Sequence, residues 1–178
     1  GSNLRTHTLA ELANSSVLQL CQFSGASEEA QLVNALTEAT TTRDGGQGQT
    51  VLIPRGEIEV TAPFNVPNRA ALIGVNKRGS RIVADAAFSG SYMVTVDNGT
   101  LSMFDNRLAH LALDCNNVAG IGGIDSQAWQ EGGGLDHVLI QSFRTYGLRI
   151  REMEGGAALC NISDSEIFGS TSGCTAGV

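Results

Sequence analysis

The sequence predicts an all-β protein, a right-handed parallel β-helix built as a solenoid of about three to five coils of roughly 27 residues each. Two observations predict this fold. From residue 51 onward the chain is a succession of short apolar runs separated by Gly, Asn and Asp, a pattern typical of a sandwich, a barrel or a solenoid. Three similar runs begin at residues 108, 135 and 162, and this fixed step of 27 favours the solenoid.

The three runs carry similar side chains at equivalent positions. Two rows are entirely aliphatic: Leu108, Leu135 and Ile162, and Leu113, Ile140 and Ile167. The row of Leu111 and Val138 is interrupted only by Ser165. Such rows are what a solenoid needs, because each coil buries its apolar side chains against the coils above and below.

The segments between the runs bear on the type of repeat. Gly120-Ile121 lies 27 residues before Gly147-Leu148, so we expect the same step there. A leucine-rich repeat is the alternative, but its L-x-x-L-x-L-x-x-N pattern occurs only at residues 108–116 and fails one step later, at Phe143. Because no helical stretch lies within each repeat, the β-helix is favoured.

The N-terminal part of the chain is predicted to differ from the coils. Residues 1–25 are expected to form an arm, with a short helix at Thr8 to Ala13 and a strand at Val17 to Phe23. Ser27 is the expected N-cap of a longer helix. The apolar stripe of this helix is formed by Leu32, Val33, Ala35, Leu36 and Ala39.

Charge and hydropathy exclude two classes of partner. The formal net charge is −7, and the eleven Lys and Arg residues form no run longer than Lys77-Arg78, so no basic stripe is available for nucleic acid. No apolar run approaches the ~20 residues that span a bilayer. We therefore expect neither nucleic-acid binding nor membrane insertion.

The four cysteines follow no metal-ligand or redox spacing. They are Cys21, Cys115, Cys160 and Cys174. Buried free thiols are favoured over disulfides, since Cys is among the residues most often fully buried.

The order of the parts resembles the pectate-lyase-like superfamily of parallel β-helices. The helical segment A-S-E-E-A-Q-L-V-N-A-L-T-E-A precedes T-V-L-I-P-R-G-E-I-E-V and then A-L-I-G-V. The resemblance implies an N-terminal capping helix that closes the open end of a β-helix domain over residues 26–178. The Asp-Asp-Thr of tailspike-like members and the N-T-D and G-H-G signatures of polygalacturonases are absent. The chain stops about one strand into a further coil, from which we expect a domain truncated at its C-terminus.

The superfamily includes polysaccharide lyases, polygalacturonases, epimerases, phage tailspikes and adhesins, so the fold alone does not give the function. The resemblance implies a polysaccharide-recognising or polysaccharide-degrading domain of a secreted, cell-surface or virion protein. Whether it is an enzyme stays open; a polysaccharide lyase or glycoside hydrolase is the expected class. The alternative is a non-catalytic structural or adhesive module, a homotrimer if outward Leu139 and Phe168 form an apolar patch. No cofactor is expected.

Candidate catalytic residues follow from the period of two in a strand. If the aliphatic rows point inward, His110 and Asp114 point outward from one coil, His137 from the next, and Asp164 and Glu166 from the third. His110, His137 and Asp164 then form a ladder with about 4.8 Å per step. Imidazoles beside carboxylates suit general acid–base catalysis or a weak metal site. The alternative is a solvated polar ladder.

Two carboxylates and one loop are further candidates. Asp114 and Glu166 are the outward pair that could serve a glycosidase. Trp129, in the loop S-Q-A-W-Q-E-G-G-G, could stack on a sugar ring, with Tyr146 and Phe143 extending that platform. A ring folded over the edge of the core is the alternative for Trp129.

Arginines form the last candidate group. Arg149 and Arg151 share one face of a predicted strand, near Arg144, and could bind a carboxylate of the substrate. The alternative is a charged rim in which they pair with Glu152 and Glu154, since exposed ion pairs are common and weak.

Overall fold

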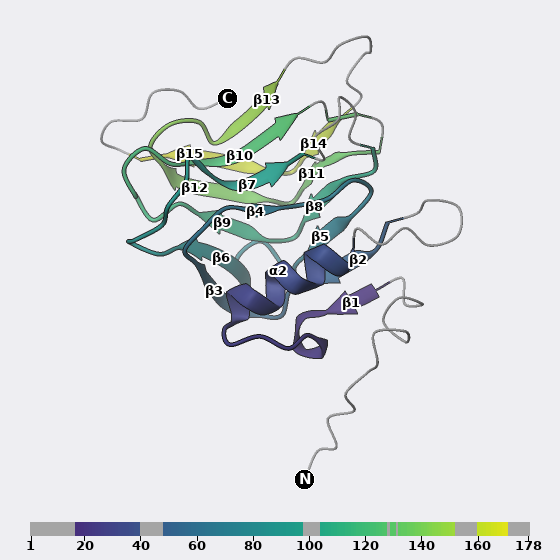
Figure 1. Ribbon diagram of the computed structural model, residues 1–178. Helices are drawn as coiled ribbons and strands as arrows, with labels where there is room; N and C mark the ends of the chain where they lie inside the picture. Colours follow the sequence, from purple (N-terminus) through teal and green to yellow (C-terminus); the bar gives the residue numbers. More distant parts are fainter. Residues whose placement is uncertain are drawn as a thin grey trace.

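The computed structural model is a stack of parallel coils (Figure 1). It describes residues 17–39, 48–97, 104–127, 129–130, 132–151 and 160–170, with only the backbone described for Gln127. Fifteen strands in this part of the chain form three parallel sheets and about four coils. The predicted parallel β-helix is therefore confirmed. The helix predicted at Thr8 to Ala13 lies outside the described residues.

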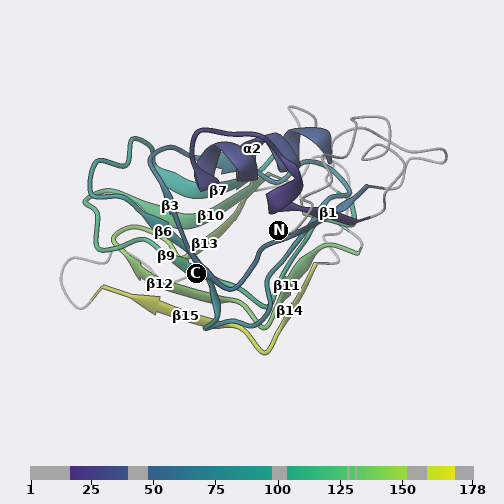
Figure 2. The ribbon, with the colours of Figure 1, turned by 90° about the horizontal axis from the view of Figure 1, so that it is seen from below.

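Each complete coil contributes one strand to each of the three sheets, which enclose the interior (Figure 2). Sheet A contains β1 (Val17–Gln19), β2 (Thr50–Leu52), β5 (Ala71–Ile73), β8 (Arg107–Ala109), β11 (Gly134–Asp136) and β14 (Asn161–Ser163). Sheet B contains β3 (Gly56–Val60), β6 (Ser80–Ala84), β9 (Ala112–Asp114), β12 (Leu139–Phe143) and β15 (Glu166–Gly169). Sheet C contains β4 (Phe64–Asn65), β7 (Tyr92–Val96), β10 (Gly122–Gln127) and β13 (Leu148–Arg151).

The register confirms the 27-residue step in the last coils of sheets A and B. The aligned residues are Leu108, Leu135 and Ile162 in sheet A, and Leu113, Ile140 and Ile167 in sheet B. The step predicted for sheet C is wrong. Leu148 pairs with Ile124 and not with Ile121, because the connection between sheets B and C is shorter in the later coil.

Coil length also varies earlier in the chain. In sheet A, Thr50 pairs with Ala71, and Ala71 pairs with Arg107, so the first of these steps is shorter than 27 residues and the second is longer. Residues 74–79 form a long connection between β5 and β6. In the later coils the corresponding connection between sheets A and B is two residues long. The strands keep their register because the corners absorb the difference.

Aliphatic rows fill the interior. Ile58, Ile82, Leu113 and Ile140 are each at most 2% exposed and lie in register across sheet B. Each side chain packs on its equivalents in the neighbouring coils, and burial of an aliphatic side chain contributes about 1.5–3 kcal/mol. Ile162 belongs to an inward row of sheet A but is 45% exposed, since no described coil packs above it.

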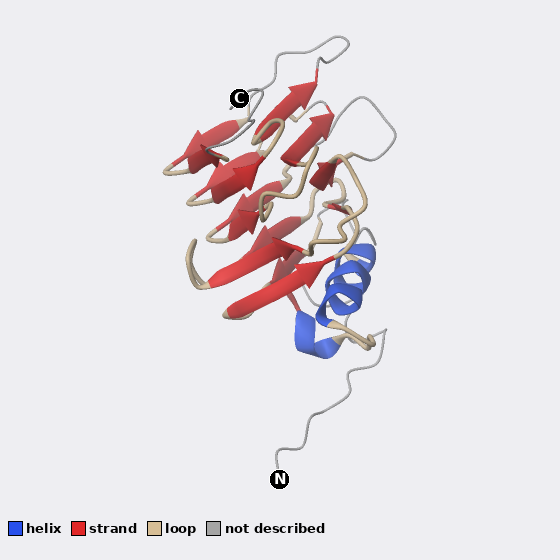
Figure 3. Ribbon diagram, turned by 90° about the vertical axis from the view of Figure 1, so that its left-hand side faces the viewer, coloured by secondary structure: helices blue, strands red, loops and turns tan. Residues whose placement is uncertain are grey.

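One α-helix lies in the described part of the chain, α2 (Glu28–Glu38), at the N-terminal end of the stack (Figure 3). The hydroxyl of Ser27 accepts a hydrogen bond from the Ala30 N–H at 3.2 Å, which confirms the predicted N-cap. Leu32, Ala35 and Leu36 are buried in the core, so α2 caps the interior; Val33, predicted in that stripe, is 42% exposed. No helix among the described residues is both long and apolar enough to cross a membrane.

The strand predicted at Val17 to Phe23 is shorter in the structure. β1 ends at Gln19, and the next three residues form the 3-10 helix η1 (Leu20–Gln22). β1 pairs in parallel with β2, so these residues of the predicted arm lie in sheet A. Cys21, Cys115 and Cys160 are free thiols, as favoured from the sequence, but of these three only Cys115 is buried; Cys21 is exposed and Cys160 is partly exposed. Cys174 lies outside the described residues.

Gly134 is a position where the backbone requires glycine. Its φ is +146°, and a Cβ there would lie 1.9 Å from the carbonyl oxygen of Asn161. Gly56 has a similar φ of +133°, but a Cβ added at Gly56 would meet no atom within 4 Å. We predict that Gly134→Ala lowers the free energy of unfolding by about 1–3 kcal/mol more than Gly56→Ala, because both introduce backbone strain but only the first adds a clash. Denaturant midpoints of the two variants measure the difference; equal midpoints would contradict it.

Candidate functional site

His110, His137 and Asp164 lie at the corner between sheets A and B. Each follows a strand of sheet A, and each has a left-handed backbone, with φ of +54°, +52° and +47°. These residues therefore do not share one continuous strand with Asp114 and its equivalents, as the period of two assumed, although the side chains of His137 and Asp164 are 46% and 71% exposed. The chain bends there, and His and Asp are among the residues that tolerate this conformation. A period of two cannot be extended across such a bend.

The corner nevertheless stacks these side chains. The ring centroids of His110 and His137 are 5.1 Å apart, with 36° between the ring planes. His137 Nε2 lies 3.9 Å from Asp164 Oδ2. Backbone hydrogen bonds join the successive coils at this corner. The N–H of His110 donates to Asp136 O and that of His137 to Ser163 O, each at 3.0 Å. Two imidazoles and a carboxylate thus follow one another along the solenoid axis.

Asp136 is a site residue that the sequence reasoning missed. Its Oδ1 accepts hydrogen bonds from His137 Nδ1 at 2.7 Å and from the Ser163 hydroxyl at 3.0 Å, and its Oδ2 pairs with Arg107. Hydrogen bonds from His137, then Arg107 and Ser163, lower the pKa of Asp136 to about 2. The sequence could have indicated Asp136, because it is the neighbour of inward-facing Leu135 in the repeat and must therefore lie on the outer face of sheet A.

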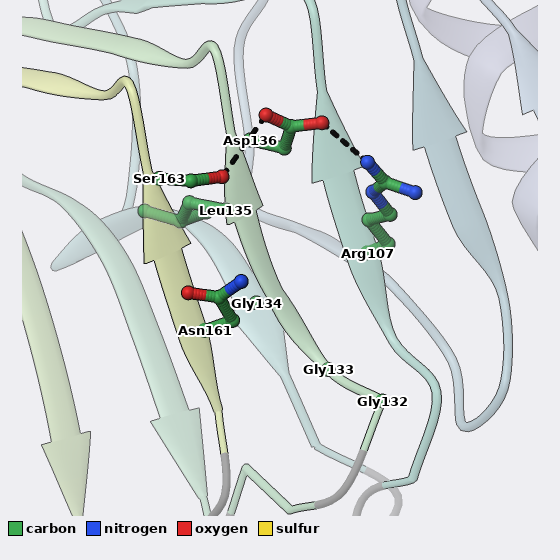
Figure 4. Close-up of a pocket in the computed structure, with 8 residues that line it drawn as sticks. All are labelled: Arg107, Gly132, Gly133, Gly134, Leu135, Asp136, Asn161 and Ser163. Atoms are coloured by element: carbon green, nitrogen blue, oxygen red, sulfur yellow. Dashed lines mark hydrogen bonds and ion pairs between the residues drawn. The ribbon is translucent and has the colours of Figure 1, made fainter.

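A groove on the outer face of sheet A adjoins this corner (Figure 4). Its volume is about 290 Å³. Arg107 and Ser163 reach toward Asp136 from the strands on either side of β11 (Figure 4). The groove is lined by Arg107, Gly132, Gly133, Gly134, Leu135, Asp136, Asn161 and Ser163. Polar side chains therefore surround a floor in which consecutive glycines provide only backbone.

Asp114 and Glu166 lie elsewhere, on the outer face of sheet B. Arg81 donates to Asp114 at 2.8 Å, and Lys77 pairs with Glu166. Burial raises the pKa of Asp114, but hydrogen bonds, beginning with the Asn116 N–H, outweigh it and lower the pKa below its ordinary value. The Lys77 hydrogen bond lowers the pKa of Glu166. Both carboxylates of the pair considered for a glycosidase are thus ion-paired with basic side chains.

The outer face of sheet B lacks the predicted apolar patch. Ala112, Leu139 and Glu166 are in register across β9, β12 and β15, and Glu166 pairs with Lys77 from the connection before β6. Leu139 is only 7% exposed, whereas Phe168 is 55% exposed. The prediction of an exposed Leu139 is therefore wrong, whereas the predicted exposure of Phe168 is confirmed.

Trp129 does not form a platform for a sugar. Its side chain is fully buried, and its indole N–H donates to the carbonyl oxygen of Asn106 at 3.0 Å. Phe143 is also fully buried, and Tyr146 is half-buried. The ring folded over the core edge, the alternative for Trp129, is what the structure shows.

Arg149 and Arg151 lie on the outer face of sheet C, as the same-face pattern predicts. Both bind Asp125, through Arg149 Nε at 2.8 Å and Arg151 Nη2 at 3.1 Å. The guanidinium carbon of Arg149 lies 4.7 Å from the Tyr92 ring centroid, and Arg151 also contacts Asp97 at 3.4 Å. Glu152 and Glu154, the expected partners, lie outside the described residues. This face is thus an ion-paired network.

Comparison with known proteins adds information on the fold. No protein-family model matches the chain, and no curated protein matches it. Solved structures do match. The A-module of mannuronan C-5 epimerase AlgE6 from Azotobacter vinelandii has a TM-score of 0.61 and 16% identity, over 83% of this chain and 43% of that one. The corresponding AlgE4 A-module has a TM-score of 0.56 and 18% identity, over 86% and 50%.

A phage protein has the same architecture. ORF18 of Geobacillus virus E2 matches with a TM-score of 0.56 and 13% identity, over 89% of this chain and 39% of that one. The chain thus spans half or less of the length of each of these structures. Together with the three parallel sheets, these matches show that the chain has the parallel β-helix fold.

Proposed function

We propose that this chain is a polysaccharide-binding β-helix domain whose binding groove lies on the outer face of sheet A. The observation that carries the proposal is the groove of about 290 Å³ beside the stacked corner side chains. Hydroxyl, amide and guanidinium groups of Ser163, Asn161 and Arg107 line it. These groups hydrogen-bond to sugar hydroxyls, and the glycine floor lets a chain approach the backbone.

The names of two similar structures support a polysaccharide as the ligand. Both are epimerases of mannuronan. In the groove the positive charge of Arg107 is matched by Asp136, and the whole chain carries a net charge of −7. This balance favours an uncharged polysaccharide, or one with isolated carboxylates, over a densely anionic polymer that the chain would repel.

Catalysis at the corner is a second proposal, and the Asp136–His137 hydrogen bond favours it. A carboxylate only accepts, so His137 Nδ1 carries the proton, and in the neutral imidazole Nε2 has a free lone pair. An imidazole oriented in this way can act as a general base. The corner therefore suits proton abstraction, as in a polysaccharide lyase, better than hydrolysis by Asp114 and Glu166, which are both ion-paired.

A protein of this kind would meet its ligand outside the cell, so we propose that it is secreted, displayed at a cell surface or carried on a virion. The phage protein among the similar structures supports the last of these sites. A tailspike-like role also stays a proposal.

The first prediction concerns the face that binds sugar. We expect Arg107→Ala to weaken binding to a polysaccharide, found by glycan-array screening, at least tenfold, because Arg107 lines the groove. Arg149→Ala removes an equally ion-paired arginine from sheet C and is expected to leave the dissociation constant unchanged. Isothermal titration with the selected polysaccharide measures both. Loss of binding in Arg149→Ala alone would move the site to sheet C.

The second prediction concerns turnover. If the corner abstracts a proton, His137→Asn lowers the rate of formation of unsaturated product at least a hundredfold and leaves binding within a few-fold, since Asn tolerates the left-handed backbone of this position. Glu166→Gln is the matched variant on sheet B and keeps its rate. Reducing-end release that depends on Glu166 would instead support a hydrolase. A chain that binds but never cleaves would support the non-catalytic module.

The third prediction concerns assembly. Of the two side chains predicted to form the trimer contact on sheet B, Phe168 is exposed and Leu139 is buried. A trimer would have three times the chain mass of 18.6 kDa in light scattering, and Phe168→Ser would reduce that mass. A wild-type mass of one chain at high concentration would contradict the trimer.

A further inference from the structure

The corner contains a group of side chains that could bind a metal ion. One ligand atom from each of Asp136, His137 and Asp164 lies within 4.8 Å of the others, and the ring of His110 stacks on that of His137. Imidazole nitrogen with carboxylate oxygen is a donor set that suits zinc and related transition metals. We propose that this corner binds a divalent transition-metal ion of the Zn²⁺ class, independently of any polysaccharide. A bound ion would occupy the lone pair of His137 Nε2, so metal binding is an alternative to the general-base role of that residue.

Asp136 orients the site and does not ligate the ion. Both of its oxygens are engaged, Oδ1 by His137 and Ser163 and Oδ2 by Arg107. Its hydrogen bond to His137 Nδ1 fixes the tautomer that leaves Nε2 as the ligand atom. A carboxylate behind a metal-binding histidine is the usual arrangement, and its loss costs about 10–100-fold in affinity.

His137 Nε2 and Asp164 Oδ2 are the direct ligands. They are 3.9 Å apart, while Zn–N and Zn–O distances are about 2.0–2.2 Å. An ion between them is therefore within reach of both after a small rotation of the Asp164 side chain, which is 71% exposed and has room to turn. The ring of His110, one coil earlier, stacks on that of His137 and supports its orientation, and water completes the coordination of the ion.

The backbone favours such a site because it holds the ligands on consecutive coils. The hydrogen bonds from the N–H groups of His110 and His137 to the next strand of sheet A fix the spacing between the steps. A rigid scaffold lowers the ordering cost of binding. The donor set also distinguishes between metals: Ca²⁺ takes six to eight oxygens, whereas nitrogen ligands favour Zn²⁺.

The experiment is titration of the full chain with Zn²⁺ in the absence of sugar, by isothermal calorimetry, together with melting temperature with and without the metal. We expect one ion per chain and a rise in melting temperature on binding. His137→Asn and Asp164→Asn keep a residue that tolerates positive φ and should each weaken Zn²⁺ binding at least tenfold. Asp136→Asn should weaken it about 10–100-fold at unchanged stoichiometry.

Two control variants keep the test specific. His7→Ala removes the histidine outside the described residues, and Glu59→Gln removes an exposed carboxylate from sheet B; both should bind Zn²⁺ as the wild type does. Unchanged affinity in His137→Asn and Asp164→Asn, loss in His7→Ala, or displacement of Zn²⁺ by equimolar Ca²⁺ would each overturn the proposal. Because no sugar is present, these outcomes are separate from the tests of polysaccharide binding.

Discussion

Parallel hydrogen bonding between successive coils is the constraint on which the rest of the structure depends. In each sheet a strand pairs only with the strands of adjacent coils, so a residue must match its equivalents one coil before and one coil after. Inward positions therefore become aliphatic rows, and outward positions become rows of polar groups at the spacing of paired strands. The groove on sheet A and the corner stack are both products of this vertical alignment.

The fold could be predicted from the sequence where coil length is constant. The steps from Leu108 to Leu135 and from Leu113 to Ile140 are equal, and a repeat that includes both is visible without any structure. Sheet C was not predicted correctly, because Leu148 pairs with Ile124 across a corner of different length. Corner lengths follow from local turns and carry no periodic signal.

The candidate site was predicted in part. His110, His137 and Asp164 were found from the repeat, but their location at a bend was not, since positive φ at a histidine leaves no mark in hydropathy. Asp136 was missed because its importance comes from its contacts with His137 and Arg107. Trp129 was misjudged for a similar reason, since a buried partner, the carbonyl of Asn106, decides where the indole lies.

The ion pair between Lys77 and Glu166 affects how the coils unfold. In a simple solenoid each coil contacts only its neighbours, and coils can detach one at a time from an end. Lys77, which precedes β6, pairs with Glu166 in β15 beyond two intervening strands. Arg151 similarly contacts Asp97 past β10. These links tie the last two described coils to earlier ones, so detaching a coil from that end also breaks ion pairs that reach past the adjacent coil.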